Sequence, residues 1–248
     1  MRRQKKYFLI FFLLGIFFWA GKYFYVYHTG VVYRGEKGER AVALTIDDGP
    51  DPRYTPKVLD ILKEHGVRAT FFVVGKQVED YPELARRIVA EGHELGNHTY
   101  THPHVENLGA SALREEVHRA NLTIERVAGV KPVWFRPPRK KLTLAEKEAV
   151  AQEGLQVALW TVALEHKAYK SPPEMVEEVE KKVEPGAIIL LHDGRLDRSR
   201  TVAALPELIV RLKRKGYRFV TLSELMRKGE KNKKEGEACQ KQQTREMF

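Results

Sequence analysis

Two adjacent aspartates, Asp47 and Asp48, directly follow the apolar run AVALTI at 41–46 and precede Gly49-Pro50. Side chains of neighbouring residues in extended backbone point in opposite directions, so the two carboxylates can serve different purposes. One can bind a metal ion while the other accepts or donates a proton. A DDGP segment is also a common turn after a strand, and taken alone it favours that simpler interpretation.

His98 and His102 are separated by four residues in the segment HTYTH. On one helical turn this spacing places both imidazoles on the same side, within reach of one cation. Two histidines and one carboxylate form a common catalytic metal site that leaves a position free for water, and Asp48 is the natural third ligand. At this spacing the two histidines could equally be ordinary surface residues, so the prediction depends on the combination with Asp48.

Arg136 and His192 also follow apolar segments, VWF and AIILL respectively. Arg136 precedes Pro137-Pro138, a stiff turn from which a guanidinium can contact a carboxylate; a purely structural ion pair is the alternative. His192 is placed to protonate a leaving amine, although a single histidine after a strand is more often an ordinary hydrogen-bonded residue.

Short apolar runs alternate with amphipathic stretches from residue 40 onward, and this pattern predicts the elements that must position these side chains. We expect about seven βα units, which imply a mostly parallel sheet covered by helices. A closed barrel and an open doubly wound sheet both fit the pattern. In either case the active-site residues are expected at the carboxyl ends of the strands. The expected strands are 41–46, 69–74, 93–97, 133–135, 155–160, 187–192 and 217–220, and the expected helices are 56–65, 82–91, 112–127, 143–153, 173–183 and 202–215.

Four segments resemble, in order, the motifs of the polysaccharide deacetylases of carbohydrate esterase family four. They are TIDDGP at 45–50, GHELGNHTYTHP at 92–103, FRPP at 135–138 and LLH at 190–192. The resemblance, which spans residues 41–225, implies an α/β fold, a distorted (β/α)7 barrel. It also implies a divalent ion, Zn²⁺ or another such as Co²⁺, bound by Asp48, His98 and His102.

The same resemblance implies roles for the remaining residues. Asp47 would be the base that deprotonates the attacking water, Arg136 would orient Asp47, and His192 would be the acid. A backbone N–H near Arg139 would help to hold the oxyanion. Leu190 would help to form the pocket for the acetyl methyl group. The full set of expected substrate-binding residues is Leu190, Pro138, Arg139 and Trp160.

The chain departs from the family pattern in two places. Arg139 and Lys140 stand where an aromatic residue and a glycine are usual, and glycine loss could alter that loop. Ala163, His166 and Lys167 stand where an Asp-x-x-Asp-Trp motif is expected after Trp160. The second aspartate of that motif supports the catalytic histidine, so we predict that His192 lacks this partner, with weaker activity or a lower pH optimum. Asp193 and Asp197 are possible substitutes.

The net charge and the composition of the chain argue against several other classes of function. The net charge is +10, of which +5 lies in residues 1–22 and +2 in residues 228–248, leaving +3 between them. No nucleic-acid motif accompanies the charge, and we expect no nucleic-acid partner and no obligatory protein partner. Cys239 is the only cysteine, which excludes an intramolecular disulfide.

The N-terminal and C-terminal segments predict the organisation of the chain and its location in the cell. Residues 7–27 form an apolar stretch interrupted only by Lys22 and preceded by four cations, which is typical of a membrane-spanning helix with a cytoplasmic N-terminus. Large aromatic residues up to Tyr27 favour an uncleaved anchor over a signal peptide, from which the protein would be secreted. The expected organisation is an anchor at 1–28, a linker at 29–40, a catalytic domain at 41–227 outside the cytoplasm, and a disordered charged tail at 228–248.

The main hypothesis is therefore a metal-dependent hydrolase that removes acetyl groups from N-acetylhexosamines of a cell-surface polysaccharide, either peptidoglycan or a chitin-like glycan. Two alternatives remain: a degenerate glycan-binding member without turnover, and a metal hydrolase of another amide or of an O-acetyl ester. Cationic residues are expected to form a rim around the mouth of the site and to favour an anionic glycan. The alternative is that this rim is merely solvated and has no effect on selectivity. The rim would consist of Arg139, Lys140, Lys141, Lys167 and Lys170.

Overall fold

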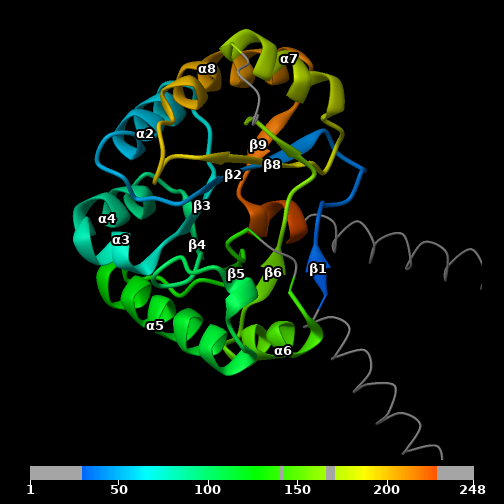
Figure 1. The fold of residues 1–248 in the computed structure, drawn as a ribbon. Coiled ribbons are helices and arrows are strands. Elements are labelled where there is room, and N and C mark those ends of the chain that lie inside the picture. Colours follow the sequence, from blue (N-terminus) through cyan, green and yellow to red (C-terminus); the bar gives the residue numbers. More distant parts are fainter. Residues whose placement is uncertain (1–29, 140–141, 166–170, 228–248) are drawn as a thin grey trace, which may run out of the picture.

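The computed structural model describes residues 30–139, 142–165 and 171–227, which form a curled parallel sheet surrounded by helices (Figure 1). The strands are β1 (Val31–Val32), β2 (Ala41–Asp47), β3 (Thr70–Val73), β4 (Glu94–Asn97), β5 (Trp134–Phe135), β6 (Gln156–Ala158), β7 (Val162–Ala163), β8 (Ile188–His192) and β9 (Arg218–Val220). The helices are α2 (Thr55–Glu64), α3 (Gly75–Asp80), α4 (Pro82–Ala90), α5 (Ala110–Ala128), α6 (Leu144–Gln152), α7 (Pro172–Lys182) and α8 (Ser199–Arg214), with a 3-10 turn at Val105–Asn107.

The strand order is β1-β6-β5-β4-β3-β2-β8-β7, and β9 pairs with the first half of β2. Every strand pair in this sheet is parallel, and the strands curl around a common interior (Figure 1). Within the described ranges, β1 and β7 end the order and do not pair with each other. The architecture is therefore a curled parallel α/β half-barrel, which fits the distorted (β/α)7 fold implied by the resemblance.

All seven predicted strands are present, together with two short strands that the pattern did not predict. Val31 and Val32 pair with β6, so part of the expected linker at 29–40 belongs to the sheet. Arg34 forms a further antiparallel bridge to Ala187. The expected helices are present within a few residues of their predicted bounds, and α3 was not predicted. Its six residues are too few for a helical period to be recognised in sequence.

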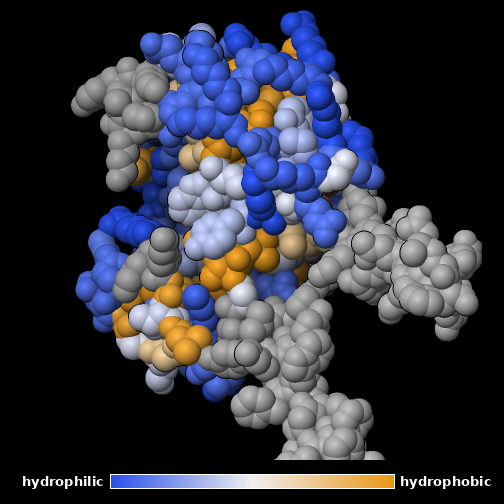
Figure 2. Space-filling model, turned by 90° about the vertical axis from the view of Figure 1, so that its right-hand side faces the viewer, coloured by the Kyte–Doolittle hydropathy of each residue, from blue (hydrophilic) through white to orange (hydrophobic). Residues whose placement is uncertain are grey.

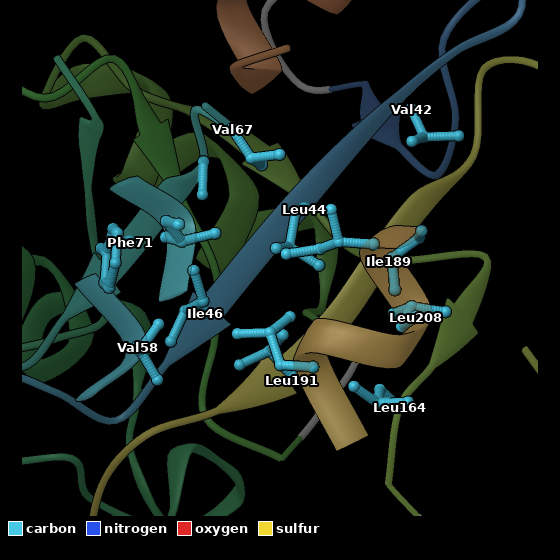
Figure 3. Packing of buried hydrophobic residues seen from close by; sticks show 14 of the residues in the cluster. Val42, Leu44, Ile46, Val58, Val67, Phe71, Leu164, Ile189, Leu191 and Leu208 are labelled. Carbon is cyan, nitrogen blue, oxygen red and sulfur yellow. The ribbon is translucent and has the colours of Figure 1, made fainter. Parts of the chain in front are cut away.

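Successive side chains of β2 point alternately toward the interior of the barrel and toward the layer of helices outside it. Val42, Leu44 and Ile46 point outward, toward Ile189 of β8 and Leu208 of α8 (Figure 3). All are at most 1% exposed, and each such buried side chain contributes about 1.5–3 kcal/mol relative to exposure. The intervening residues of β2, which include Thr45 and Asp47, face the interior instead. The outward side chains of β2 therefore pack against the helices, and the inward direction of Asp47 places its carboxylate in the site.

The predicted anchor at 1–28 and the predicted tail at 228–248 lie outside the described residues. Among the residues described, no helix is both long and apolar enough to cross a membrane. The side of the body shown in Figure 2 is largely hydrophilic, with smaller hydrophobic patches between its centre and its lower part.

Candidate active site

Polar side chains from four strand ends converge on one cavity of about 770 Å³. The cavity is lined by Asp47, Asp48, His98, His102, Pro137, Arg139, Trp160, Glu165, Leu190, His192, Arg195, Leu196 and Arg198. Of the expected substrate-binding residues, Leu190, Arg139 and Trp160 lie in this lining. Pro138 does not, and its neighbour Pro137 takes that place. Arg136 lies beneath the cavity, completely buried.

Asp48, His98 and His102 offer one ligand atom each, and these three atoms lie within 4.8 Å of one another. The Oδ1 atom of Asp48 is 3.0 Å from Nε2 of His102 and 3.5 Å from Nε2 of His98. All three side chains are at most 7% exposed, so the group is enclosed by protein. Two imidazole nitrogens and one carboxylate oxygen are a suitable ligand set for a divalent transition metal.

The two histidines converge through a tight loop, not through the helical turn predicted from their spacing. Thr99 and His102 have positive φ angles of 67° and 58°, which a helix cannot contain. Nevertheless, the rings of His98 and His102 lie 5.0 Å apart in an edge-to-face arrangement. The spacing prediction was therefore wrong in conformation, although it identified the correct pair.

Two polar residues that sequence reasoning did not identify hold this loop in place. Asn97 accepts from the backbone N–H of Thr99 and donates to the Val117 carbonyl oxygen of α5. Glu116, also in α5, accepts hydrogen bonds from the backbone N–H groups of Tyr100 and Thr101 at 3.0 and 2.8 Å. Helix α5 therefore determines the position of the loop that carries both histidines.

The electrostatics of the three residues suit a cation. Burial alone would raise the pKa of Asp48, but its contacts with His102 and His98 outweigh burial and hold that pKa well below its ordinary value. Burial lowers the pKa of His102, which favours its neutral form. The Nδ1 atom of His98 lies 2.6 Å from the backbone oxygen of Arg136, so Nδ1–H donates there and Nε2 is the nitrogen that faces Asp48. An ionised Asp48 and a neutral His102 are the forms that metal binding requires.

Asp47 is held by Arg136 in the interior of the barrel. The Arg136 NH1 group donates to Oδ1 of Asp47 at 2.8 Å and to the hydroxyl of Thr45 at 2.9 Å. Its Nε and NH2 groups donate to the backbone oxygens of Ala158 and Leu159. Burial lowers the pKa of Arg136, with Asp47 acting in the opposite direction. Because the guanidinium is satisfied on several sides, it fixes the orientation of Asp47 and compensates its charge.

The prediction that His192 lacks an acidic partner was wrong, because Glu165 supplies one. Its Oε2 atom lies 2.9 Å from Nδ1 of His192, and its Oε1 atom accepts from the His192 backbone N–H at 3.0 Å. Neither suggested substitute occupies this position: Asp193 accepts from Thr55, and Asp197 accepts from Tyr54. Burial alone would lower the pKa of His192, but Glu165 and nearby Asp47 raise it overall.

Glu165 stands one residue before the position at which the family pattern has its second acid. The longer glutamate side chain reaches His192 from this earlier position. An acidic residue adjacent to the missing aspartate was the sequence signal that could have revealed it. Position 166, where the aspartate was expected, lies outside the described residues.

Replacing Glu165 with glutamine is expected to move the alkaline limb of the pH–rate profile to lower pH. The carboxylate favours protonated His192, so its loss lowers the pKa of that histidine and the acid is deprotonated at lower pH. The measurement is kcat as a function of pH for the wild type and the Glu165→Gln variant. Glu64→Gln, at an exposed position at the end of α2, is the matched control. An unchanged alkaline limb in Glu165→Gln would show that this carboxylate does not tune His192.

The cavity mouth carries cations that only partly match the predicted rim. Arg139 is present there, and it contacts His104 at 3.0 Å. The other four predicted members, at 140, 141, 167 and 170, lie outside the described residues. Arg195 and Arg198 also line the cavity and were not predicted. Arg195 is exposed, whereas Arg198 is buried against carboxylates.

Comparisons with known proteins agree with this geometry. The family model of polysaccharide deacetylases matches residues 34–158. A peptidoglycan-N-acetylglucosamine deacetylase of Bacillus cereus is 39% identical over 199 residues, which are 79% of this chain and 93% of the relative. The chain belongs to the polysaccharide deacetylase family. A chitooligosaccharide deacetylase of a Bradyrhizobium species is also 39% identical, over 78% of this chain and 94% of that family member.

A solved structure in the same family shows that membership alone does not establish turnover. It is a pseudoenzyme of carbohydrate esterase family 4 from Bacillus anthracis, with a TM-score of 0.74 and 33% identity. The match covers 79% of this polysaccharide deacetylase and 69% of the pseudoenzyme. Turnover by the present family member therefore depends on the residues of its own site.

Proposed function

We propose that this polysaccharide deacetylase hydrolyses the acetamido groups of N-acetylhexosamine residues in a cell-surface glycan, with peptidoglycan as the preferred substrate. The observation that carries the proposal is the convergence of Asp47 and His192 on the cavity that contains Asp48, His98 and His102. A base, an acid and a complete set of metal ligands thus share one enclosed site. A degenerate member would be expected to lack at least one of them.

Asp48, His98 and His102 would hold the divalent ion, for which Zn²⁺ is the first choice and Co²⁺ a substitute. When bound, such an ion acts as a Lewis acid toward the water nucleophile and the amide carbonyl. The burial of the three ligands fits this assignment, and so does the lowered pKa of His102, which favours its neutral form.

Asp47 is the general base in this proposal. Arg136 engages its Oδ1 atom, so Oδ2 can take the proton from the attacking water. Because Arg136 is itself anchored to backbone oxygens, the carboxylate does not have to be oriented during the reaction.

His192 is the general acid. Its Nδ1 atom faces Glu165, which leaves Nε2 to deliver a proton to the departing sugar amine. The raised pKa of His192 favours the protonated ring, which is the form that the departing amine requires. Leu190 and Trp160 provide apolar surface around the acetyl group and the sugar ring.

The experiment that tests the function is acetate release by the full chain in detergent. Peptidoglycan, chitooligosaccharide and acetylxylan are compared, each with chelator and with added Zn²⁺. We expect Zn²⁺-dependent release from the two N-acetylated glycans and the fastest release from peptidoglycan. Binding of glycan without acetate release would support the degenerate alternative, and release only from acetylxylan would support an esterase.

The preference for peptidoglycan is attributed to the exposed Arg195, together with Arg139, at the cavity mouth. Peptidoglycan carries carboxylates, whose attraction to cations is screened by salt. We expect Arg195→Gln to lower kcat/KM for muropeptides roughly tenfold at low salt, with little change for neutral chitotetraose. Arg86→Gln, at an exposed site on α4, should leave both substrates unaffected. Equal losses on both substrates, or a salt-independent rate on muropeptides, would remove this basis for selectivity.

We further propose that the catalytic domain lies outside the cytoplasm and is held at the membrane by the apolar segment 7–27. The support is the sequence alone: a stretch long enough to span about 30 Å, with four cations before it. Protease added to intact cells should remove the body and leave a short N-terminal fragment in the membrane. Recovery of the protein from the medium would instead indicate that the segment is cleaved.

A further inference from the structure

Arg198 lies between two carboxylates that serve different parts of the site. Its NH2 group donates to Oδ2 of Asp48 at 3.2 Å, and its NH1 group donates to Oε2 of Glu165 at 3.0 Å. Its Nε atom donates to the backbone oxygen of Gly194 at 2.9 Å. The side chain is only 10% exposed, so these contacts are formed away from bulk water. All three guanidinium nitrogens are therefore used, each by a different residue.

The backbone brings Arg198 to this position through a turn that packs directly on Asp48. A Cβ atom at Gly194 would come within 2.5 Å of the Asp48 backbone oxygen, so only glycine fits there. Arg195 follows with a φ of 66°, and Arg198 then precedes the first residue of α8. The segment that carries Arg198 is thus fixed against the residue that its guanidinium contacts. This arrangement is unlike that of a surface ion pair between two mobile side chains.

The two oxygens of Asp48 consequently have different surroundings. Oδ1 faces the Nε2 atoms of His98 and His102, whereas Oδ2 accepts from Arg198. In Glu165, by contrast, a single oxygen, Oε2, lies near both His192 and Arg198, whereas Oε1 accepts from the His192 backbone N–H. A planar guanidinium can hold two carboxylates at fixed positions, which a lysine ammonium cannot do equally well.

We propose that Arg198 is a positioning residue that makes Asp48 present only Oδ1 to the divalent ion and keeps Glu165 on His192. The proposal rests on the proposed function of the site. Without Arg198, Oδ2 of Asp48 becomes free to join Oδ1 as a ligand, and the Glu165 carboxylate loses a contact that holds it beside the acid. Extra oxygen ligands would fill the positions that water and substrate need. The cation would then remain bound in a site with poorer catalysis.

The test uses the full chain in detergent with Arg198→Met, which keeps an unbranched apolar stem and removes the guanidinium with its hydrogen bonds and charge. Arg200→Met, at an exposed position in the first turn of α8, is the matched control. The first readout is the visible absorption spectrum of the Co²⁺-loaded protein, which responds to the number of ligands and does not require turnover. We expect Arg198→Met to bind Co²⁺ at least as tightly as the wild type, with weaker absorption typical of higher coordination.

The second readout is steady-state kinetics on a muropeptide with Zn²⁺. We expect kcat to fall about 10- to 100-fold in Arg198→Met with a smaller change in KM, and Arg198→Lys to lie between Arg198→Met and the wild type. A Co²⁺ spectrum and a kcat equal to those of Arg200→Met would overturn the proposal. So would loss of Co²⁺ binding in a variant whose thermal unfolding is unchanged, because Arg198 would then be needed for metal retention. If the wild type bound Co²⁺ but released no acetate, the proposed function would fail while the spectral comparison still tested Arg198.

Discussion

Replacing Asp47 with asparagine is expected to lower kcat/KM for acetate release by about 10²–10⁴-fold, the usual contribution of a general base. Asparagine keeps the size of the side chain and can still accept from Arg136 through its amide oxygen, but it cannot take a proton from water. Asp47 is not among the three residues that converge as metal ligands, so the bound metal should remain stoichiometric. The measurements are initial rates of acetate release and metal content of the same purified sample.

The matched control for this substitution is Asp80→Asn, on an exposed residue of α3 that pairs with Lys76. It should retain wild-type rates, because it removes a carboxylate far from the cavity lining. An Asp47→Asn variant that keeps both its metal and more than about a tenth of its activity would exclude Asp47 as the base.

Removal of a metal ligand should have an effect at least as large. Replacing His102 with alanine deletes one of two imidazoles that approach Oδ1 of Asp48, and we expect loss of stoichiometric metal and a fall in activity of at least about 10³-fold. Chelation of the wild type should produce the same loss. Added Zn²⁺ should restore the chelated wild type but not the His102→Ala variant at the same concentration.

His118→Ala provides the comparison for this variant, because His118 is half-exposed on α5 and contacts Glu153 away from the cavity. It should keep its metal and its activity. Full activity of the chelated wild type, measured in the presence of excess chelator, would contradict a metal-dependent reaction. The same conclusion would follow if His102→Ala were as active as His118→Ala.

Much of the architecture could be predicted because strand and helix periods differ so clearly along this chain. The runs at 41–46 and 187–192 became β2 and β8, and the rule that sites lie at the carboxyl ends of parallel strands brought Asp47 and His192 together. The elements that were missed are short. Val31 and Val32 form a two-residue strand whose stability depends on pairing with β6, which no local pattern can reveal.

The residues of the site could be predicted from the sequence, but the residues that hold them in position could not. The spacing of His98 and His102 identified the pair, whereas the loop that joins them depends on Asn97 and on Glu116, fifteen residues from Thr101. Arg198 is 150 residues from Asp48 in sequence, and only the packing of the Gly194 turn brings it near. Such contacts are tertiary, so composition and periodicity carry no signal for them.

Glu165 shows a different limit of sequence reasoning. The family pattern has its acid at the following position, and its absence led to the prediction of an unsupported His192. Glu165 stands one residue earlier and has a side chain one methylene longer than aspartate, and its Oε2 atom lies 2.9 Å from Nδ1 of His192. The negative charge beside His192 is therefore present, although the residue at the expected position is not acidic. This substitution is the strongest argument, among the described residues, against loss of catalysis at this site.

The central claim is that one divalent ion is held by Asp48, His98 and His102 beside the base Asp47. Anomalous diffraction from crystals of the protein grown with Zn²⁺, recorded on both sides of the zinc absorption edge, tests it most directly. We expect one strong peak in the cavity, about 2.0–2.2 Å from Nε2 of both histidines and from Oδ1 of Asp48. A cavity without a peak in fully loaded crystals, or a zinc ion bound only elsewhere, would contradict it.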